Sequence, residues 1–243
     1  MEHAEYDKMD AVEDRMWWYR AMHAHALRAL DGLPADAAIL DAGCGTGGFL
    51  LKLRRAFPAA HLAGLEYFPE AARRAANKAR AQVTSGTINA LPFPDRRFDA
   101  VVSLDVLCHR AVEPAEALAE LHRVLKPGGR LLLNLPAHEW LRSAHDIRVH
   151  TARRFDRRGA AALLGQAGFE AVEARHWNSL LLPLMLVQRK VLARKDDAAS
   201  DVQEFPPWLD AALHAATRVE ARLISAGLRF PAGGSLLATA TRP

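Results

Sequence analysis

The stretch Ile39–Gly48, ILDAGCGTGG, limits the fold of this chain more than any other part of its sequence. An apolar run leads into four glycines within ten residues, and Asp41 stands just before them. Glycine adopts left-handed backbone angles without a steric penalty, so such a loop lets a ligand come close to the backbone. A helix that follows the loop turns its positive end toward that ligand. The stretch therefore predicts a strand, a ligand-binding turn and a helix.

Similar apolar or β-prone runs recur along the chain, bounded by Gly, Pro and Asp. We predict strands over residues 37–43, 61–67, 84–90, 98–104, 130–136, 170–177 and 235–242. Helical spacing of apolar residues predicts helices over 48–57, 69–82, 114–129 and 156–169, with Pro69 and Pro114 in a first helical turn. Strands that alternate with helices predict an α/β fold with a doubly wound, mostly parallel sheet.

The length of 243 residues suits one domain with additions, since domains typically hold about 100–200 residues. We predict a single domain over 1–243, with a ligand-binding core over 37–177 and 235–242. The segments that break the strand and helix alternation are interpreted as a cap that binds the second substrate. These cap segments cover 1–36, 137–155 and 178–234.

Composition excludes several classes of protein. The sequence has no signal segment and no apolar run of about 18 residues, which predicts a cytoplasmic location. Cys44 and Cys108 are too few for a disulfide framework. The net charge of +4 comes from dispersed arginines rather than from a basic block with aromatics, so we expect no nucleic-acid partner.

Asp41 distinguishes between the ligands that a glycine loop can hold. Gly43, Gly45 and Gly48 satisfy G-x-G-x-x-G, and Glu66 follows about 20 residues on, as in dinucleotide-binding proteins. A phosphate-binding Walker loop is excluded because no Lys-Ser or Lys-Thr pair follows. A carboxylate at Asp41 would repel a pyrophosphate and attract a ligand that carries an ammonium and a sulfonium. An NAD(P)-dependent oxidoreductase stays as the alternative.

The segment LDAGCGTGGF resembles motif I, D/E-x-G-x-G-x-G, of class I S-adenosylmethionine-dependent methyltransferases. INALPFPDRRFDAVVSLDVLCH and VLKPGGRLLLNLP resemble later blocks of the UbiE/UbiG-like, methyltransferase type 11 subgroup. The resemblance covers about Ile39–Pro136. It implies a Rossmann-like seven-stranded sheet whose last strand is antiparallel, and S-adenosyl-L-methionine as the cofactor.

The resemblance also implies a set of cofactor-binding residues. Glu66 matches the acid that holds both ribose hydroxyls, and Asn89 stands where the family most often has an Asp that accepts from the adenine amino group. Asn still offers a carbonyl acceptor, without the charge-assisted component. The full predicted set is Asp41, Gly43, Cys44, Gly45, Gly47, Glu66, Tyr67, Asn89, Ala90, Leu91, Asp105 and His109.

The predicted chemistry is in-line displacement at an activated methyl, so alignment of the acceptor matters more than a base. His109, His145 and His150 are candidate bases or acceptor contacts, because imidazole titrates near neutral pH. The alternatives are a loop-structuring hydrogen bond for His109, a turn cap for His145 with Asp146, and solvent exposure for His150 ahead of the basic run 153–158. No metal site is predicted, because no second ligand cluster accompanies these histidines.

Two cap segments have more than one interpretation. Trp17, Trp18 and Tyr19 predict either an aromatic lid over the acceptor or core packing. Residues 179–195, SLLLPLMLVQRKVLARK, predict an amphipathic segment that touches a membrane surface or lines a lipophilic pocket, or else a helix packed on the sheet. A helix over 206–227 is predicted to join it as a roof over the site.

Taken together, these patterns predict methyl transfer to an O, N or C atom of a small-molecule acceptor, a biosynthetic intermediate of lipophilic character. The alternatives are the oxidoreductase and a non-catalytic cofactor-binding partner of another enzyme, because this chemistry needs no fixed nucleophile. The expected oligomeric state is a monomer or a homodimer.

Overall fold

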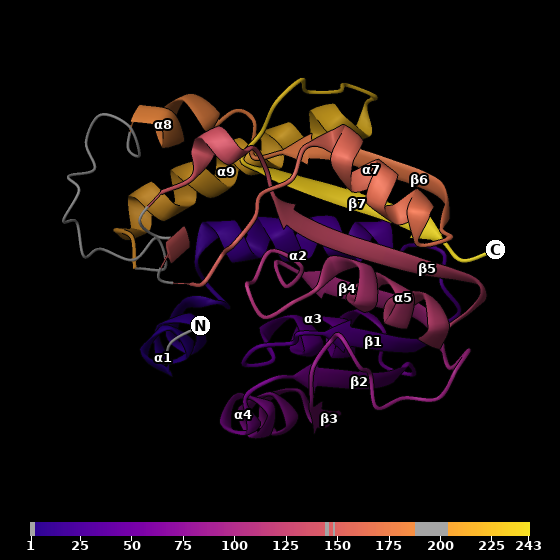
Figure 1. The fold of residues 1–243 in the computed structure, drawn as a ribbon. Helices are drawn as coiled ribbons and strands as arrows, with labels where there is room; N and C mark the ends of the chain where they lie inside the picture. Colours follow the sequence, from indigo (N-terminus) through magenta and orange to yellow (C-terminus); the bar gives the residue numbers. More distant parts are fainter. Residues whose placement is uncertain (1–2, 144–145, 148, 188–203) are drawn as a thin grey trace.

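A single seven-stranded sheet forms the centre of the molecule (Figure 1). The computed structural model describes residues 3–143, 146–147, 149–187 and 204–243. The strand order is β3-β2-β1-β4-β5-β7-β6, and β7 runs antiparallel to its neighbours β5 and β6. The other adjacent pairs are parallel. The predicted sheet, with its antiparallel last strand, is confirmed.

Most predicted strands lie within a residue or two of their observed bounds. They are β1 (Ala38–Ala42), β2 (His61–Glu66), β3 (Gln82–Ser85), β4 (Phe98–Leu104), β5 (Leu125–Pro136), β6 (Glu170–Trp177) and β7 (Ser235–Thr241).

Several predicted element bounds are wrong. The strand predicted over 130–136 begins at Leu125, and the helix predicted over 69–82 ends at Ala79. The strand predicted over 84–90 ends at Ser85, and a loop follows it. The helix predicted to reach residue 129 ends at Val124. Pro127 explains the early end, because the residue before a proline is pushed out of the helical region. Gly128, with φ of 74°, then turns the chain within β5.

Helices cover both faces of the sheet, which confirms the doubly wound arrangement (Figure 1). Neighbouring residues of one strand point to opposite faces. Val101 accordingly packs in a core cluster with Leu118 and Leu164, whereas Val102 packs in a second cluster with Leu50. The first face carries α5 (Pro114–Val124) and α7 (Arg157–Gln166); the second carries α2 (Trp17–Ala29), α3 (Gly48–Ala56) and α4 (Pro69–Ala79).

The remaining elements lie in the segments predicted as a cap, which also contain α2. These elements are α1 (His3–Val12), the short helix η1 (Glu139–Leu141), α8 (Leu182–Leu186) and α9 (Pro207–Ser225). The helix α9 packs along α2 (Figure 1), where Leu213 joins a third core cluster with Trp17 and Trp177. The backbone N–H of Trp17 donates to Asp210 Oδ1 at 2.7 Å, which fixes the start of α2 against α9.

Candidate functional site

A cavity of about 750 Å³ opens at the carboxyl ends of β1, β2 and β4. The strand order reverses direction between β1 and β4, and ligands of open α/β sheets bind at such a switch point. The sheet contributes the glycine loop and the segments after β2 and β4, while the cap contributes residues of α1, α2, α8 and the segment 146–154. The cavity therefore lies where the sequence places the cofactor and the acceptor.

The glycine loop has the geometry that its sequence predicts. Gly43 and Gly45 have φ of 96° and 54°, and both line the cavity. A Cβ on Gly43 would lie 2.2 Å from Val106 Cγ2, so only glycine fits there. Gly47 packs against Ala75 of α4 instead, and Cys44 is buried. These last two predicted contacts support the loop and are not among the residues that line the cavity.

Asp41 is 1% exposed, lies on β1 just before the glycine loop, and is not among the described residues that line the cavity. Within the described residues, its Oδ2 atom has no hydrogen-bond partner. Burial raises the pKa of Asp41 to about 8, with the charges of Glu66 and Glu13 acting in the same direction. A cationic ligand beside this acid would lower its pKa again and favour the carboxylate, whereas a pyrophosphate at the same loop would raise the pKa further.

Glu66 lines the cavity at the end of β2 and already accepts three hydrogen bonds. Its Oε1 atom accepts from the Tyr6 hydroxyl at 2.8 Å and from the backbone N–H of Phe68 at 3.2 Å. Its Oε2 atom accepts from the backbone N–H of Gly45 at 2.9 Å. Tyr67, which follows it, is 62% exposed and also lines the cavity. Sequence reasoning missed Tyr6, because nothing in the local pattern links α1 to β2.

Asn89, Ala90 and Leu91 are not among the described residues that line the cavity. The Asn89 side chain accepts from the backbone N–H of Glu113 and donates to the carbonyl of Ala111, each at 3.1 Å. These residues therefore join the loops that follow β3 and β4. The cavity wall there is formed by Gly86, Thr87 and Ile88 instead. The sequence pattern did not indicate this loop, because it predicted a strand over 84–90.

Asp105 and His109 line the cavity after β4, as predicted. Burial raises the pKa of Asp105 to about 7, although the amide of Asn134 and the charge of Arg154 act in the opposite direction. Burial lowers the pKa of His109 to about 4, so its imidazole is neutral near pH 7. The side chain of His109 is thus a hydrogen-bonding group at neutral pH and a weak base.

The structure brings one more candidate histidine to the cavity. His150 is exposed, has φ of 57° and lines the cavity beside His109, and its carbonyl accepts from the backbone N–H of Arg110 at 3.0 Å. His145 lies outside the described residues. In the part of the chain that the structure describes, no group of three His, Cys, Asp or Glu side chains is placed to hold a metal ion.

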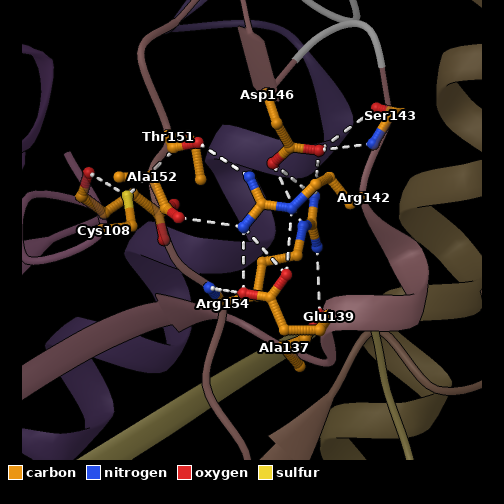
Figure 2. A network of polar contacts seen from close by, with 10 residues as sticks. Cys108, Ala137, Glu139, Arg142, Ser143, Asp146, Thr151, Ala152 and Arg154 are labelled. Carbon is orange, nitrogen blue, oxygen red and sulfur yellow. Dashed lines mark hydrogen bonds and ion pairs between the residues drawn. The ribbon is translucent and has the colours of Figure 1, made fainter. Parts of the chain in front are cut away.

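Two arginines of the basic run 153–158 are hydrogen-bonded within the protein. Arg154 pairs with Asp146 at 2.8 Å, with side chains 4% and 2% exposed (Figure 2). It also donates to the carbonyl of Ala137 at 3.0 Å. Arg153 donates to the carbonyls of Leu107, His109 and Val112. Both Arg154 and Asp146 line the cavity, and their network fixes this wall to the end of β5.

Of the two interpretations of Trp17, Trp18 and Tyr19, core packing is observed, and the lid over the acceptor stays a prediction. All three line the cavity, and Trp17 and Tyr19 also pack in the third core cluster. Trp18 stacks on Trp177 with ring centroids 6.2 Å apart.

Between β6 and β7, Met185 and Phe205 line the cavity, whereas no described residue of α9 does so. The helix α9 therefore covers α2 rather than the cavity. The part of the predicted amphipathic segment from residue 188 onward lies outside the described residues.

Comparisons with known proteins agree with this geometry. Residues 40–133 match the model of a family described as a methyltransferase domain. The chain contains a methyltransferase domain. The match runs from β1 through the glycine loop and β4 into β5, so it covers most of the sheet side of the cavity.

Several curated methyltransferases are similar to this part of the chain. A demethylmenaquinone methyltransferase from Deinococcus radiodurans is 36% identical over 121 residues, 48% of this chain and 48% of the relative. The sterol 24-C-methyltransferase erg-4 from Neurospora crassa is 34% identical over 128 residues, 50% of this chain and 32% of the relative. The chain thus spans less than half the length of these relatives.

A solved structure extends the likeness to almost the whole chain. It is the Haloferax volcanii complex between the Trm112 methyltransferase activator and a methyltransferase, with a TM-score of 0.64 and 22% identity over 99% of this chain and 95% of that one. This likeness shows a shared fold that includes the cap. Over the residues that our structure describes, no helix has the length and apolar character needed to cross a membrane.

Proposed function

We propose that this protein transfers the methyl group of S-adenosyl-L-methionine to a small-molecule acceptor, with S-adenosyl-L-homocysteine as the product. The observation that carries the proposal is Asp41, a buried acid with an unsatisfied oxygen just before the glycine loop of a methyltransferase domain. The ammonium and the sulfonium of S-adenosyl-L-methionine would supply the opposite charge that stabilises this acid as a carboxylate.

Residues of the sheet edge would hold the cofactor. Gly43 and Gly45 would let the cofactor approach the backbone, and Glu66 would accept hydrogen bonds from the ribose hydroxyls. Thr87 and Ile88 would lie beside the adenine in place of Asn89, whose side chain is bonded elsewhere. The bound cofactor supplies a methyl group that its sulfonium has already activated. The protein then aligns the acceptor and excludes water, and orientation alone can contribute about 7–11 kcal/mol to a two-reactant step.

The cap side of the cavity supports an acceptor of lipophilic character. Apolar and aromatic side chains outnumber the polar ones here. The polar side chains are Asp146, His150, Thr151, Arg154 and Asn178, and the apolar and aromatic ones are Tyr6, Met9, Met16, Trp17, Trp18, Tyr19, Met22, Val149, Met185 and Phe205. The volume of about 750 Å³ lies in the upper part of the roughly 300–1,000 Å³ found for ligand pockets. The names of the two relatives, which refer to a menaquinone precursor and a sterol, point to the same class.

Thermal unfolding with separate additions tests the cofactor. S-adenosylmethionine or S-adenosylhomocysteine at about 100 times its Kd should add roughly 2.7 kcal/mol, which for a chain of this size raises the midpoint by about 5–11 °C. NADH should leave the midpoint unchanged. A shift with NADH alone would reverse the proposal in favour of the oxidoreductase.

A turnover screen with labelled S-adenosylmethionine tests the acceptor. Lipophilic phenols, quinols and amines should accept the label, whereas amino acids and nucleosides should not. Turnover confined to highly polar acceptors would contradict the proposed class. Cofactor binding without turnover across both groups would favour the non-catalytic partner.

A further inference from the structure

A chain of hydrogen bonds across the sheet fixes Asp105 at the cavity wall. Trp177 Nε1–H donates to Asn134 Oδ1 at 2.8 Å, and Asn134 Nδ2 donates to Asp105 Oδ2 at 3.0 Å. The indole is a donor only, so it determines which way the amide of Asn134 faces. The NH₂ group of the amide then faces Asp105 and donates to one of its carboxylate oxygens. The other carboxylate oxygen receives no hydrogen bond from Asn134.

The second carboxylate oxygen of Asp105 differs from the unpartnered oxygen of Asp41, because Asp105 is one of the residues that line the cavity. Oδ1 is shielded from solvent and has no partner among the residues that the structure describes. Asp105 lines the cavity and has φ of 55°, a left-handed conformation that is uncommon outside glycine and places the residue at the sharp end of β4. The carboxylate torsion is soft, so a small rotation can offer Oδ1 to a bound molecule.

We propose that Asp105 accepts the proton of the methyl acceptor, and that the acceptor therefore carries an O–H or N–H group at the reacting atom. This inference rests on the proposed function. The acceptor's X–H bond breaks with its proton going to Asp105 and its electron pair staying on X. X then bonds to the methyl carbon, while the pair of the carbon–sulfur bond goes to sulfur and yields S-adenosylhomocysteine.

The other acids at the cavity are already bonded. Asp146 accepts from Arg154 through both oxygens, and Glu66 accepts three hydrogen bonds. His109 is the remaining candidate of the predicted set on this loop, and burial lowers its pKa to about 4, so it holds a proton less firmly than Asp105 does. Asp105 is the group at this wall that combines a free oxygen with sufficient basicity.

Binding to the protein saturated with S-adenosylhomocysteine tests the proposal with two matched pairs of probes. The first pair is 2-naphthol and 2-methoxynaphthalene, which differ by the proton on oxygen. The second is 1-naphthylmethylamine and its N-trimethyl derivative, which both carry a positive charge but only the first has N–H groups. In at least one pair, the proton-bearing probe should bind about tenfold tighter or more, as for a hydrogen bond to a charged group.

The isosteric variant Asp105→Asn should remove that preference while keeping the affinity for S-adenosylhomocysteine within about twofold of the wild type. Asp14→Asn, at an exposed acid paired with Lys52, is the matched control and should change neither affinity. Loss of S-adenosylhomocysteine binding in Asp105→Asn would overturn the proposal by making Asp105 a cofactor ligand. Equal binding within both pairs, or no binding of any probe, would also overturn it. A wild-type protein that fails to bind S-adenosylhomocysteine would refute the proposed function instead.

Trp177→Phe tests the positioning chain. Without the indole N–H, Asn134 can turn its carbonyl toward Asp105, so the preference for the proton-bearing probe should fall by about threefold or more while S-adenosylhomocysteine binding stays unchanged. A merely structural role of Trp177 would lower the unfolding midpoint and leave the preference intact, which would contradict the positioning role. If Trp177→Phe does not fold, Asp105→Asn alone decides the proposal.

Discussion

Two acids at the sheet edge and one ion pair in the cap differ in how their buried polar atoms are satisfied. At the sheet edge, Asp41 and Asp105 each keep one oxygen without a described partner, and burial raises the pKa of both. In the cap segment, Asp146 and Arg154 are as deeply buried, yet they satisfy each other through bidentate hydrogen bonds (Figure 2). Burial alone therefore does not decide whether an acid is satisfied within the protein.

An unsatisfied buried acid and a satisfied ion pair have different consequences for ligand binding and for stability. An unsatisfied buried acid costs free energy in the ligand-free protein, and a ligand that supplies its partner recovers that cost on binding. A satisfied ion pair offers little to a ligand, but removal of one partner leaves a bare charge. We therefore expect the sheet edge to hold a ligand, whereas the pair of Asp146 and Arg154 supports the cavity wall.

Arg154→Met gives the largest expected effect of this difference. The substitution keeps the length of the side chain and leaves Asp146 buried without its counter-ion, so the free energy of unfolding should fall by about 3–5 kcal/mol. Urea unfolding monitored by tryptophan fluorescence measures the change.

Arg175→Met is the control, because Arg175 pairs with Glu173 at an exposed position with side chains 50% and 62% exposed. Its loss should cost at most about 1 kcal/mol. Similar small losses for both variants would mean that the cap pair is no better coupled than a surface pair, and the contrast between the two regions would disappear.

Asp41→Asn should have the opposite sign in the ligand-free protein. Because the folded pKa of Asp41, about 8, exceeds the ordinary value of 3.8, the folded state holds a proton that the unfolded state has lost between these values. Stability therefore falls as pH rises from about 4 to 8 and levels off above. The asparagine variant lacks this fall, and near pH 8 it should be more stable than the wild type by about 1–3 kcal/mol.

The same variant should bind S-adenosylmethionine about 5- to 150-fold more weakly, as for a lost bond to a charged group. Titration calorimetry at pH 8, together with thermal unfolding at pH 5 and 8, measures both effects. If the variant is less stable than the wild type at pH 8, then the carboxyl of Asp41 has hydrogen-bond partners in the ligand-free protein, as Asp146 has in the cap.

The two regions also differ in how far the sequence predicts them. Asp41, the glycine loop, Glu66 and Asp105 all follow apolar strands at local spacings, so pattern alone places them at one edge of the sheet. Tyr6 meets Glu66 across 60 residues of sequence, and Arg154 sits in a basic run that looks solvated. Such contacts arise from tertiary packing of the cap, for which apolar periodicity carries no signal. Thr87 escaped prediction for a different reason, because the TSGTINA segment reads equally well as a strand or as a loop.

Tyr6→Phe gives the smallest expected effect, at the point where the two regions meet. A carboxylate oxygen offers two lone pairs, and Tyr6 and the Phe68 backbone N–H already use those of Glu66 Oε1. Two ribose hydroxyls therefore cannot both bind Glu66 until Tyr6 withdraws. Removal of the hydroxyl should strengthen S-adenosylhomocysteine binding by about 2- to 10-fold, because one donor that competes with the ribose for this carboxylate is gone.

Arg74→Ala is the matched control for this effect, because Arg74 ties α1 to α4 through Asp7 without touching Glu66. Titration calorimetry on the two variants separates competition at the carboxylate from loosening of α1. An equal gain in both would assign the effect to the mobility of α1. Weaker binding in Tyr6→Phe would mean that the tyrosine hydroxyl contacts the cofactor itself, and α1 would then belong with the sheet edge as part of the binding site.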